Sequence, residues 1–227
     1  MSKLYIVGTP IGNMEDITLR AIRILGEVDI VLCEDTRVTL NLLKHHGINK
    51  PILLSYHSQS KLSKTDQILD LLKAGKNMAL VSDAGTPTIS DPGSMLIATV
   101  KKELPEVEIF VVPGPSAVVS ALSISGLHTA EFTFLGFLPH KKGRQTLFGE
   151  IAESERTMIF YESPHRIIKC LTSLKEVLAP ERKVVVAREL TKIYEQIVSG
   201  SAEEVLKYFE TNTDKVRGEF VVLVGGK

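Results

Sequence analysis

The segment Val81 to Gly93, VSDAGTPTISDPG, decides how this sequence is expected to fold. It continues an apolar run that starts at Met78, and this run predicts a strand that is buried on both faces. The segment itself is rich in small residues, prolines, glycines and aspartates, which are typical of a loop that carries a function. We therefore predict a functional site where this strand ends. The alternative is an ordinary connection between a strand and a helix.

Individual residues of this loop predict its local geometry. Gly85 allows the backbone to approach a ligand closely, because it has no Cβ atom. Ser90 or Asp91 is expected to cap a helix that runs over residues 92–103, with Pro92 in its first position, where a missing N–H costs nothing.

Strand and helix signals alternate through the first half of the chain. Strands are expected over residues 4–8, 28–33, 51–56, 78–81 and 108–112, each followed by a helix. Asp16 is expected to cap the first helix, and Ser63 with Asp66 resembles a capping box for the third. This alternation predicts an α/β domain with a mostly parallel five-stranded sheet and flanking helices.

Four of these strands end in unusual residues. The four segments are TPIGN (9–13), EDTR (34–37), SDAGTP (82–87) and PGPS (113–116). In an open parallel sheet all such loops meet at the carboxyl edge, where ligands bind. The first domain is therefore expected to carry its site chemistry on one edge.

The pattern changes near Glu131. Strands are expected over residues 132–137, 157–161, 183–188, 195–199 and 220–224, with helices between several of them. Two of these strands flank Glu189 to Tyr194, as in an antiparallel hairpin with an elaborated turn. We predict a second, α+β domain with a mixed sheet, and domain boundaries of 1–128 and 129–227.

Composition restricts the classes of function. The 227 residues include 27 Lys and Arg and 27 Asp and Glu, so no overall field attracts nucleic acid or an anionic membrane, and any polyanion must meet a local patch. Cys33 and Cys170 lie in apolar runs, which indicates reduced core thiols. No apolar run reaches the ~18 residues of a membrane span. These features predict a soluble, cytoplasmic protein with no membrane partner.

Common cofactor and metal motifs are missing from the sequence. It has no G-x-x-x-x-G-K-[ST] segment, and Gly8 and Gly12 are four apart, so the usual ATP and NAD enzymes are disfavoured. The six histidines are scattered, and no metal site is expected. A cleft of small residues suits a ligand that main-chain N–H and C=O groups hold.

Seven motifs resemble those of the tetrapyrrole (corrin/porphyrin) methylase superfamily, in family order over nearly the whole chain. They are GTPIGN (8–13), EDTR (34–37), VSDAGTPTISDPG (81–93), VPGPSA (112–117), GFLP (136–139), YESPHR (161–166) and ARELTKIYE (187–195). The resemblance is strongest to the branch that methylates the ribose 2′-oxygen of a cytidine in the decoding region of 16S ribosomal RNA. Two alternatives are a C-methyltransferase for a small tetrapyrrole and a nucleotide-binding module without chemistry.

The resemblance implies that S-adenosylmethionine binds, folded up, in a cleft between the two domains, and that the protein forms a homodimer. Carried over by position, the cofactor contacts are Pro10, Asp83, Ala84, Gly85, Thr86, Asp91, Pro92, Ser116, Leu138, Ala187 and Gly218. Asp83 has a second interpretation as an Asx-turn residue that only shapes its loop.

A ribose hydroxyl is a poor nucleophile, so the reaction needs close alignment and a proton acceptor. The candidates at motif positions are Glu34, Asp35, Glu162, Arg188, Glu189 and Lys192. Of these, Glu189 or Lys192 is expected to handle the proton, and Asp35 is the further catalytic candidate. An ion pair between Glu189 and Arg188 that supports the hairpin is an equally good interpretation.

Basic residues are expected to hold the RNA, either the 16S RNA itself or the small ribosomal subunit. Arg37, Arg166 and Arg188 are expected to grip phosphates bidentately. The basic run that contains Lys141, Lys142 and Arg144 is expected to follow the RNA backbone, or else to form a solvated loop.

Overall fold

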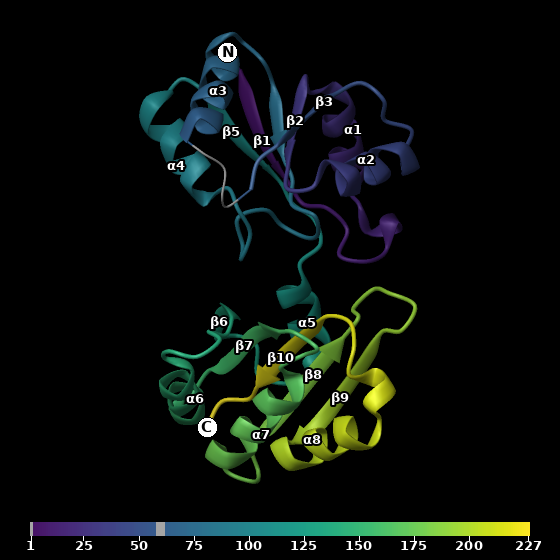
Figure 1. Cartoon of the computed structure of the whole chain (residues 1–227), viewed down its shortest axis with the longest axis vertical. Helices are drawn as coiled ribbons and strands as arrows, with labels where there is room; N and C mark the ends of the chain where they lie inside the picture. The colour runs from purple at the N-terminus through teal and green to yellow at the C-terminus, as the bar shows by residue number, and fades with distance from the viewer. Residues whose placement is uncertain (1, 58–61) are drawn as a thin grey trace. The chain divides into compact units, whose positions relative to one another are not determined.

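The computed structural model describes residues 2–57 and 62–227 (Figure 1). The chain divides into two compact units, Met1–Ser116 and Ala117–Lys227. This division lies twelve residues before the predicted boundary at 128/129, and the difference is helix α5 (Ala117–Ser125) with the residues that follow it. α5 contacts strands β10 and β8 of the second unit, so its packing assigns it there.

The first unit contains a parallel sheet, as predicted. Its strand order is β3-β2-β4-β1-β5, and every neighbouring pair is parallel. The strands are β1 (Lys3–Val7), β2 (Ile30–Cys33), β3 (Ile52–Ser55), β4 (Met78–Leu80) and β5 (Glu108–Val112). All five carboxyl ends therefore lie on one edge, where the site was expected.

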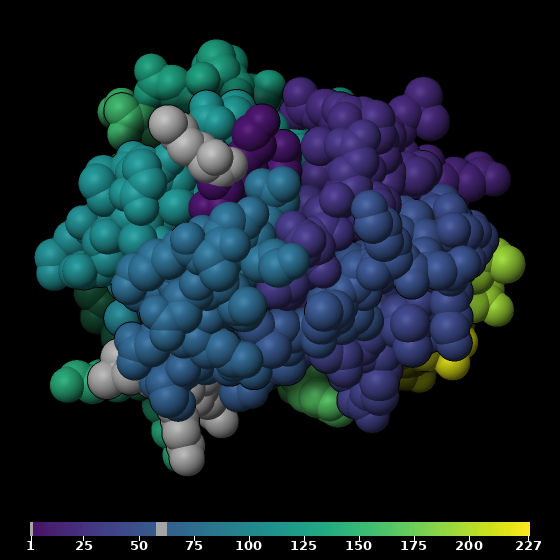
Figure 2. Space-filling view, turned by 90° about the horizontal axis from the view of Figure 1, so that it is seen from above, coloured from purple at the N-terminus to yellow at the C-terminus, as the bar shows by residue number. Residues whose placement is uncertain are grey.

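Helices cover both faces of this sheet (Figure 1). They are α1 (Leu19–Glu27), α2 (Thr36–His45), α3 (Leu62–Lys73) and α4 (Ser94–Glu103), and a short 3₁₀ helix, η1 (Met14–Asp16), precedes α1. Alternate strand residues serve the two faces: Leu32 packs in the core under α3 and α4, whereas Val31 and Cys33 pack under α1 and α2. Figure 2 looks onto this unit, whose surface draws on its whole length, from purple to teal.

The second unit contains a mixed sheet, as predicted. Its order is β6-β7-β10-β8-β9; β6 and β7 are parallel, and the other neighbours are antiparallel. The strands are β6 (Phe132–Phe137), β7 (Thr157–Glu162), β8 (Lys183–Arg188), β9 (Gln196–Ser201) and β10 (Phe220–Val224). Helices α6 (Arg144–Glu153), α7 (Ile167–Val177) and α8 (Ala202–Thr211) supply the core on one face, and a 3₁₀ helix, η2 (Thr213–Lys215), follows α8.

Three predicted helix starts were wrong. The side chain of Thr18, not Asp16, caps α1, because it accepts the Ala21 N–H at 3.1 Å while Asp16 belongs to η1. Ser63 lies inside α3, which begins at Leu62, so it is not a cap. α8 has a capping box that the sequence analysis did not identify, between Ser201 and Glu204.

The third wrong start is that of α4. This helix begins at Ser94, with Gly93 as its N-cap at φ 127°, rather than at Pro92. Thr88 and Ser90 also have positive φ values, of 76° and 64°, so the segment before the helix keeps an irregular loop conformation. Gly93 is required there because a Cβ atom would lie 2.7 Å from Cδ2 of Leu80.

None of the helices within the described residues is both long enough and apolar enough to cross a bilayer.

Candidate functional site

The loops after β1 and β4 are joined by a short antiparallel bridge between Thr9 and Gly85. The Thr9 N–H donates to the Gly85 carbonyl at 2.9 Å, and the Gly85 N–H donates to the Thr9 carbonyl at 3.1 Å. The Thr9 hydroxyl also donates to the Ser82 carbonyl at 3.1 Å. Gly85 has φ +80°, which a residue with a side chain rarely adopts. The two loops therefore form one fixed structure.

The loop after β5 joins this structure through close backbone packing. A Cβ atom on Gly8 would lie only 2.8 Å from Cα of Gly114, so both positions need glycine. The Thr86 hydroxyl donates to the Pro115 carbonyl at 3.2 Å. The structure thus brings together three of the four selected strand ends, those after β1, β4 and β5.

The loop after β2 is connected to the others through Asp83. The Asp35 N–H donates to Oδ1 of Asp83 at 3.1 Å. The carboxylate of Asp35 caps α2 by accepting the Arg37 N–H at 2.8 Å. Asp83 therefore orders the turn before α2 from a neighbouring strand, beyond the local Asx-turn role that was the alternative.

Carboxylates concentrate on this edge. Burial raises the pKa of Glu34, and the charges of Asp91 and Asp83 raise it further. Burial also raises the pKa of Asp91; a hydrogen bond from Ser82 opposes this shift and the charge of Asp83 adds to it. The edge therefore has a negative potential that would be relieved by a bound cation.

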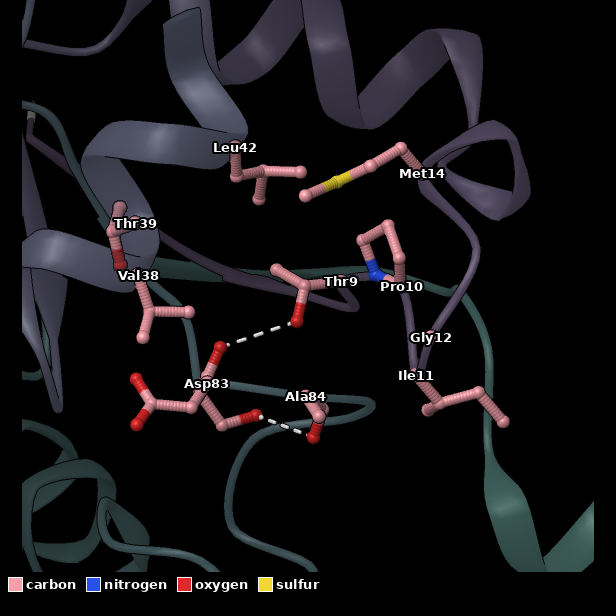
Figure 3. Close-up of a pocket in the computed structure, with 11 residues that line it drawn as sticks. Thr9, Pro10, Ile11, Gly12, Met14, Val38, Thr39, Leu42, Asp83 and Ala84 are labelled. Atoms are coloured by element: carbon pink, nitrogen blue, oxygen red, sulfur yellow. Dashed lines mark hydrogen bonds between the residues drawn. The ribbon is translucent and has the colours of Figure 1, made fainter. Parts of the chain in front are cut away.

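A pocket of about 190 Å³ lies beside these loops within the first unit (Figure 3). Its lining comes from the β1 loop with η1, from the first turns of α2 and from the β4 loop. The lining residues are Thr9, Pro10, Ile11, Gly12, Met14, Val38, Thr39, Leu42, Ser82, Asp83 and Ala84. Figure 3 shows Met14 and Leu42 extending into the same side of the pocket, with Asp83 and Ala84 opposite. The walls are mainly apolar.

Asp35, a predicted catalytic residue, is bound to Arg37. Its carboxylate lies 2.5 Å from the Arg37 guanidinium. Hydrogen bonds from the side chain and the backbone of Arg37 lower the pKa of Asp35 to about 2. Asp35 is therefore ionised and bonded at neutral pH, whereas the Arg37 side chain remains largely exposed.

Glu189 and Lys192 form a cluster with Glu219. The Lys192 ammonium lies 2.9 Å from Oε1 of Glu189 and 2.9 Å from Oε2 of Glu219. Burial favours a higher pKa for Glu189, but hydrogen bonds from Lys192 and from the Glu219 N–H outweigh it, so the pKa is lowered. Burial favours a lower pKa for Lys192, but its hydrogen bonds to both carboxylates outweigh it, so the pKa is raised. Both groups are therefore charged at neutral pH.

The turn that carries this cluster has an unusual backbone. Glu189 and Thr191 have positive φ values of 51° and 64°, and Gly218 has φ 90°. A Cβ atom on Gly218 would lie 2.5 Å from Oε1 of Glu189, so the glycine makes room for that carboxylate. Such backbone conformations are typical of functional sites.

The hydrogen bonds of Arg188 go to backbone carbonyls, and its interaction with Glu189 is limited to a charge contribution that lowers the pKa of that carboxyl. Its guanidinium donates to the Arg217 carbonyl at 2.7 Å and to the Tyr194 carbonyl at 3.3 Å, and the residue is buried. Arg188 thus fixes the backbone of the turn and does not present its charge to a phosphate.

Arg144 and Arg166, also predicted to bind RNA, both pair with the buried Glu162. The carboxylate oxygens of Glu162 lie 2.8 Å from Arg144 and 2.7 Å from Arg166. The same guanidiniums donate to the carbonyls of Pro139 and Leu138 at 3.2 Å and 3.0 Å. This cluster holds the loop after β6, and we assign it a structural role in place of the predicted phosphate contacts. Lys141 and Lys142 remain exposed.

The proposed cofactor residues of the second unit occupy three elements. Leu138 follows β6 and is buried, Ala187 lies in β8 opposite Val221, and Gly218 precedes β10. Within the described ranges, no group of three His, Cys, Asp or Glu side chains is arranged to hold a metal ion.

Sequence reasoning missed the α2 wall of the pocket. Val38 and Leu42 are spaced i, i+4, which predicts core packing, and nothing in the sequence distinguishes a pocket wall from a core face. Met14 was also missed, because nothing in the sequence marks it as part of a pocket wall. Two motifs did signal the pocket: GTPIGN, which supplies Thr9 to Gly12, and SDAGTP, which supplies Ser82, Asp83 and Ala84.

Comparison with known proteins gives a consistent family. Residues 3–206 match the profile of the Tetrapyrrole (Corrin/Porphyrin) Methylases. The chain is 44% identical to ribosomal RNA small subunit methyltransferase I of Thermotoga maritima over 227 residues, which is 100% of both chains. It is 46% identical to the protein of the same name from Synechocystis sp., covering 100% of this chain and 80% of that one.

Solved structures with the same fold are more distant in sequence. A cobalt precorrin-4 methyltransferase has a TM-score of 0.69 at 21% identity, covering 98% of this chain and 94% of the other. A uroporphyrin-III C-methyltransferase from Thermus thermophilus, in complex with S-adenyl homocysteine, has a TM-score of 0.64 at 20% identity, covering 99% and 97%. At these identities the similarity establishes the fold.

Proposed function

Because this chain belongs to the tetrapyrrole (corrin/porphyrin) methylase family, we propose that it is an S-adenosylmethionine-dependent methyltransferase that acts on small-subunit ribosomal RNA. The observation that carries the proposal is the similarity, along the entire chain, to relatives named for that activity. Within this function we propose the finer assignment, transfer to the ribose 2′-oxygen of a cytidine in the decoding region.

The joined loops of the first unit supply the proposed cofactor contacts Pro10, Asp83, Ala84, Gly85, Thr86, Asp91, Pro92 and Ser116. Two properties support the assignment. Glycine and proline expose main-chain groups at the edge, and the carboxylates of Glu34, Asp83 and Asp91 give it a negative potential. A sulfonium cofactor is positively charged, so such an edge favours it electrostatically. We propose that Leu138, Ala187 and Gly218 complete the contacts from the second unit.

S-adenosylmethionine held by these residues would supply an electrophilic methyl group for the ribose oxygen, whose hydroxyl proton would have to be taken up. A residue of the chain must accept that proton. We propose Glu189, because it is ionised at neutral pH, whereas Lys192 is already protonated. Lys192 holds the carboxylate in place through its 2.9 Å contact. Asp35 is a weaker candidate, since Arg37 keeps its pKa at about 2.

The RNA contacts are proposed from the basic side chains that remain accessible. Arg37 is exposed next to the β2 loop, and Lys141 and Lys142 are exposed before α6. These side chains are suited to phosphate contacts, which contribute affinity without reading sequence.

The test is the transfer of tritiated methyl groups from S-adenosylmethionine to purified small ribosomal subunits, with uroporphyrinogen as the control acceptor. We expect label in the ribosomal RNA and none in the tetrapyrrole, and nuclease digestion should locate it on a ribose. Label in uroporphyrinogen alone would instead support a tetrapyrrole C-methyltransferase.

We also propose that the protein works in the cytoplasm as a homodimer. Both cysteines are free and buried, which fits a reducing compartment. Light scattering coupled to size-exclusion chromatography tests the dimer, because a mass of one chain, 25.0 kDa, would contradict it.

A further inference from the structure

The pocket beside the β1 and β4 loops contains a wall that no proposed cofactor contact uses. This wall is formed by Met14 of η1 and by Val38 and Leu42 of α2. We propose that the pocket binds the base of the nucleotide that is methylated. The inference rests on the proposed function and names the substrate part that this site takes.

The volume of the pocket is suited to a single base. The pocket volume of about 190 Å³ lies below the ~300 Å³ at the lower limit of pockets for drug-sized ligands. A whole cofactor or a tetrapyrrole macrocycle is too large, whereas one planar ring system is of suitable size.

The apolar side chains of the lining are also suited to binding a base. RNA bases that leave the stack are held between apolar or aromatic surfaces by proteins that bind single strands. Here Pro10, Ile11 and Leu42 provide apolar surface, and Met14 provides an adaptable thioether side chain. Two hydroxyl groups of the lining are already engaged, since Thr9 donates to the Ser82 carbonyl and Ser82 donates to the Ala84 carbonyl, and these bonds fix the loop that forms this wall (Figure 3).

The pocket also lies next to the proposed cofactor contacts. The pocket lining also includes Pro10, Asp83 and Ala84, which are proposed to contact the methyl donor. An acceptor must lie within about 3–3.5 Å of the methyl carbon in a productive complex. A pocket that shares a wall with the donor is therefore suited to hold the acceptor's nucleoside, and we assign the adjacent phosphate to Arg37, whose side chain is exposed one residue before Val38.

A binding experiment tests the proposal without catalysis. We would label the methionine methyl groups with ¹³C, assign Met14 with Met14→Leu, and titrate with cytidine monophosphate, ribose 5-phosphate or S-adenosylmethionine. We expect a ring-current shift of the Met14 methyl resonance with cytidine monophosphate and none with ribose 5-phosphate. No shift with the nucleotide, or an equal shift with S-adenosylmethionine alone, would overturn the proposal, and the second result would assign the pocket to the donor.

A substitution experiment tests the same pocket during turnover. Val38→Trp should fill the pocket, and Leu40→Trp is the matched control, because Val38 and Leu40 are 41% and 42% exposed on α2 and only Val38 lines the pocket. We expect Val38→Trp to lower kcat/KM for ribosomal subunits at least tenfold with the S-adenosylmethionine Kd unchanged within twofold, and Leu40→Trp to change neither. Equal rates for both variants would refute the pocket assignment. An inactive wild-type protein would refute the proposed function instead, and the methyl titration would still decide the pocket.

Discussion

Arg144 and Glu162 form an ion pair at 2.8 Å in which both side chains are buried. The second oxygen of Glu162 pairs with Arg166, so one carboxylate balances two guanidiniums. The buried Arg144 and the partly buried Arg166 come from different segments of the chain, and both donate hydrogen bonds to carbonyls of the β6–α6 loop.

We expect Glu162→Gln to destabilise the protein strongly, because it leaves the buried Arg144 and the partly buried Arg166 without a counter-charge. Breaking a buried pair costs about 3–5 kcal/mol. Urea unfolding monitored by circular dichroism measures the loss. Glu153→Gln is the control, since Glu153 pairs with Lys227 at the surface and its loss should change the midpoint little. Similar midpoints for the two variants would contradict the structural role assigned to Glu162.

A substitution of Arg182 should also destabilise the protein. This buried side chain donates to the carbonyls of Ile151, Ala152 and Ser154, at the end of α6, and to that of Gly225. We expect Arg182→Met to cost at least about 2 kcal/mol, because several buried carbonyls lose their donor. Hydrogen exchange should show faster opening of the last turn of α6 in the variant. Unchanged exchange there would exclude Arg182 as its cap.

Gly8→Ala should damage the cofactor edge specifically. The added methyl group would meet Gly114 at 2.8 Å, which forces the β1 and β5 loops apart. We expect the S-adenosylmethionine Kd to rise tenfold or more in calorimetry. Gly26→Ala is the matched control, because a Cβ atom there meets nothing within 4 Å, and helix propensity predicts a small gain in stability. A Kd that is unchanged in Gly8→Ala would remove these loops from the cofactor site.

Asp91→Asn should stabilise the free protein and weaken cofactor binding. Because burial raises the pKa of Asp91, the fold favours the protonated carboxyl, and stability is lost as the pH rises above its ordinary value of 3.8. The asparagine variant escapes that loss. Its Tm should therefore exceed that of the wild type by a few degrees at most at pH 7, since 1 kcal/mol is roughly 2–4 °C for a chain of this size.

The Tm difference between Asp91→Asn and the wild type should shrink as the pH falls towards 4, which differential scanning calorimetry can follow. A difference that grows on acidification would show that the raised pKa has been assigned to the wrong residue. Cofactor affinity that is unchanged in the variant would place Asp91 outside the site.

Glu189→Gln and Asp35→Asn should separate the two carboxylates proposed for proton transfer. General bases contribute about 10²–10⁴-fold, and the lowered pKa of Glu189 places it at the lower end of that range. We expect kcat to fall about 100-fold in Glu189→Gln and only a few-fold in Asp35→Asn, which retains an N-cap acceptor, with the cofactor Kd unchanged in both. Single-turnover methylation measures the rates. Full activity of Glu189→Gln would remove this residue from the mechanism.

The strands could be predicted from the sequence because burial leaves a direct mark on composition. β5, β8 and β10 coincide with their predicted ranges, since each is a β-branched run bounded by polar or turn residues. The start of α4 could not be predicted, because it depends on the positive φ of Gly93 and on the lack of room for a Cβ atom beside Leu80, which only the folded chain creates.

Part of the candidate site could also be predicted, for a reason of topology. Loops that end adjacent parallel strands meet by topology, so their gathering follows from the strand pattern. The ion pair between Arg144 and Glu162 could not be predicted in this way. Arg144 lies in a basic run, which predicts a solvated surface, and its buried partner Glu162 is 18 residues away. Local sequence cannot distinguish a charge that faces water from one that a distant carboxylate neutralises.

The position of β10 has a consequence for synthesis of the chain. This strand follows every other strand of its sheet in the sequence, yet it lies between β7 and β8 and pairs with both. Until β10 has emerged from the ribosome, β6–β7 and β8–β9 can form only two separate strand pairs. In each pair one apolar strand, β7 or β8, has an unpaired edge. Such edges invite aggregation, so cotranslational folding of this half should depend on chaperones until β10 inserts.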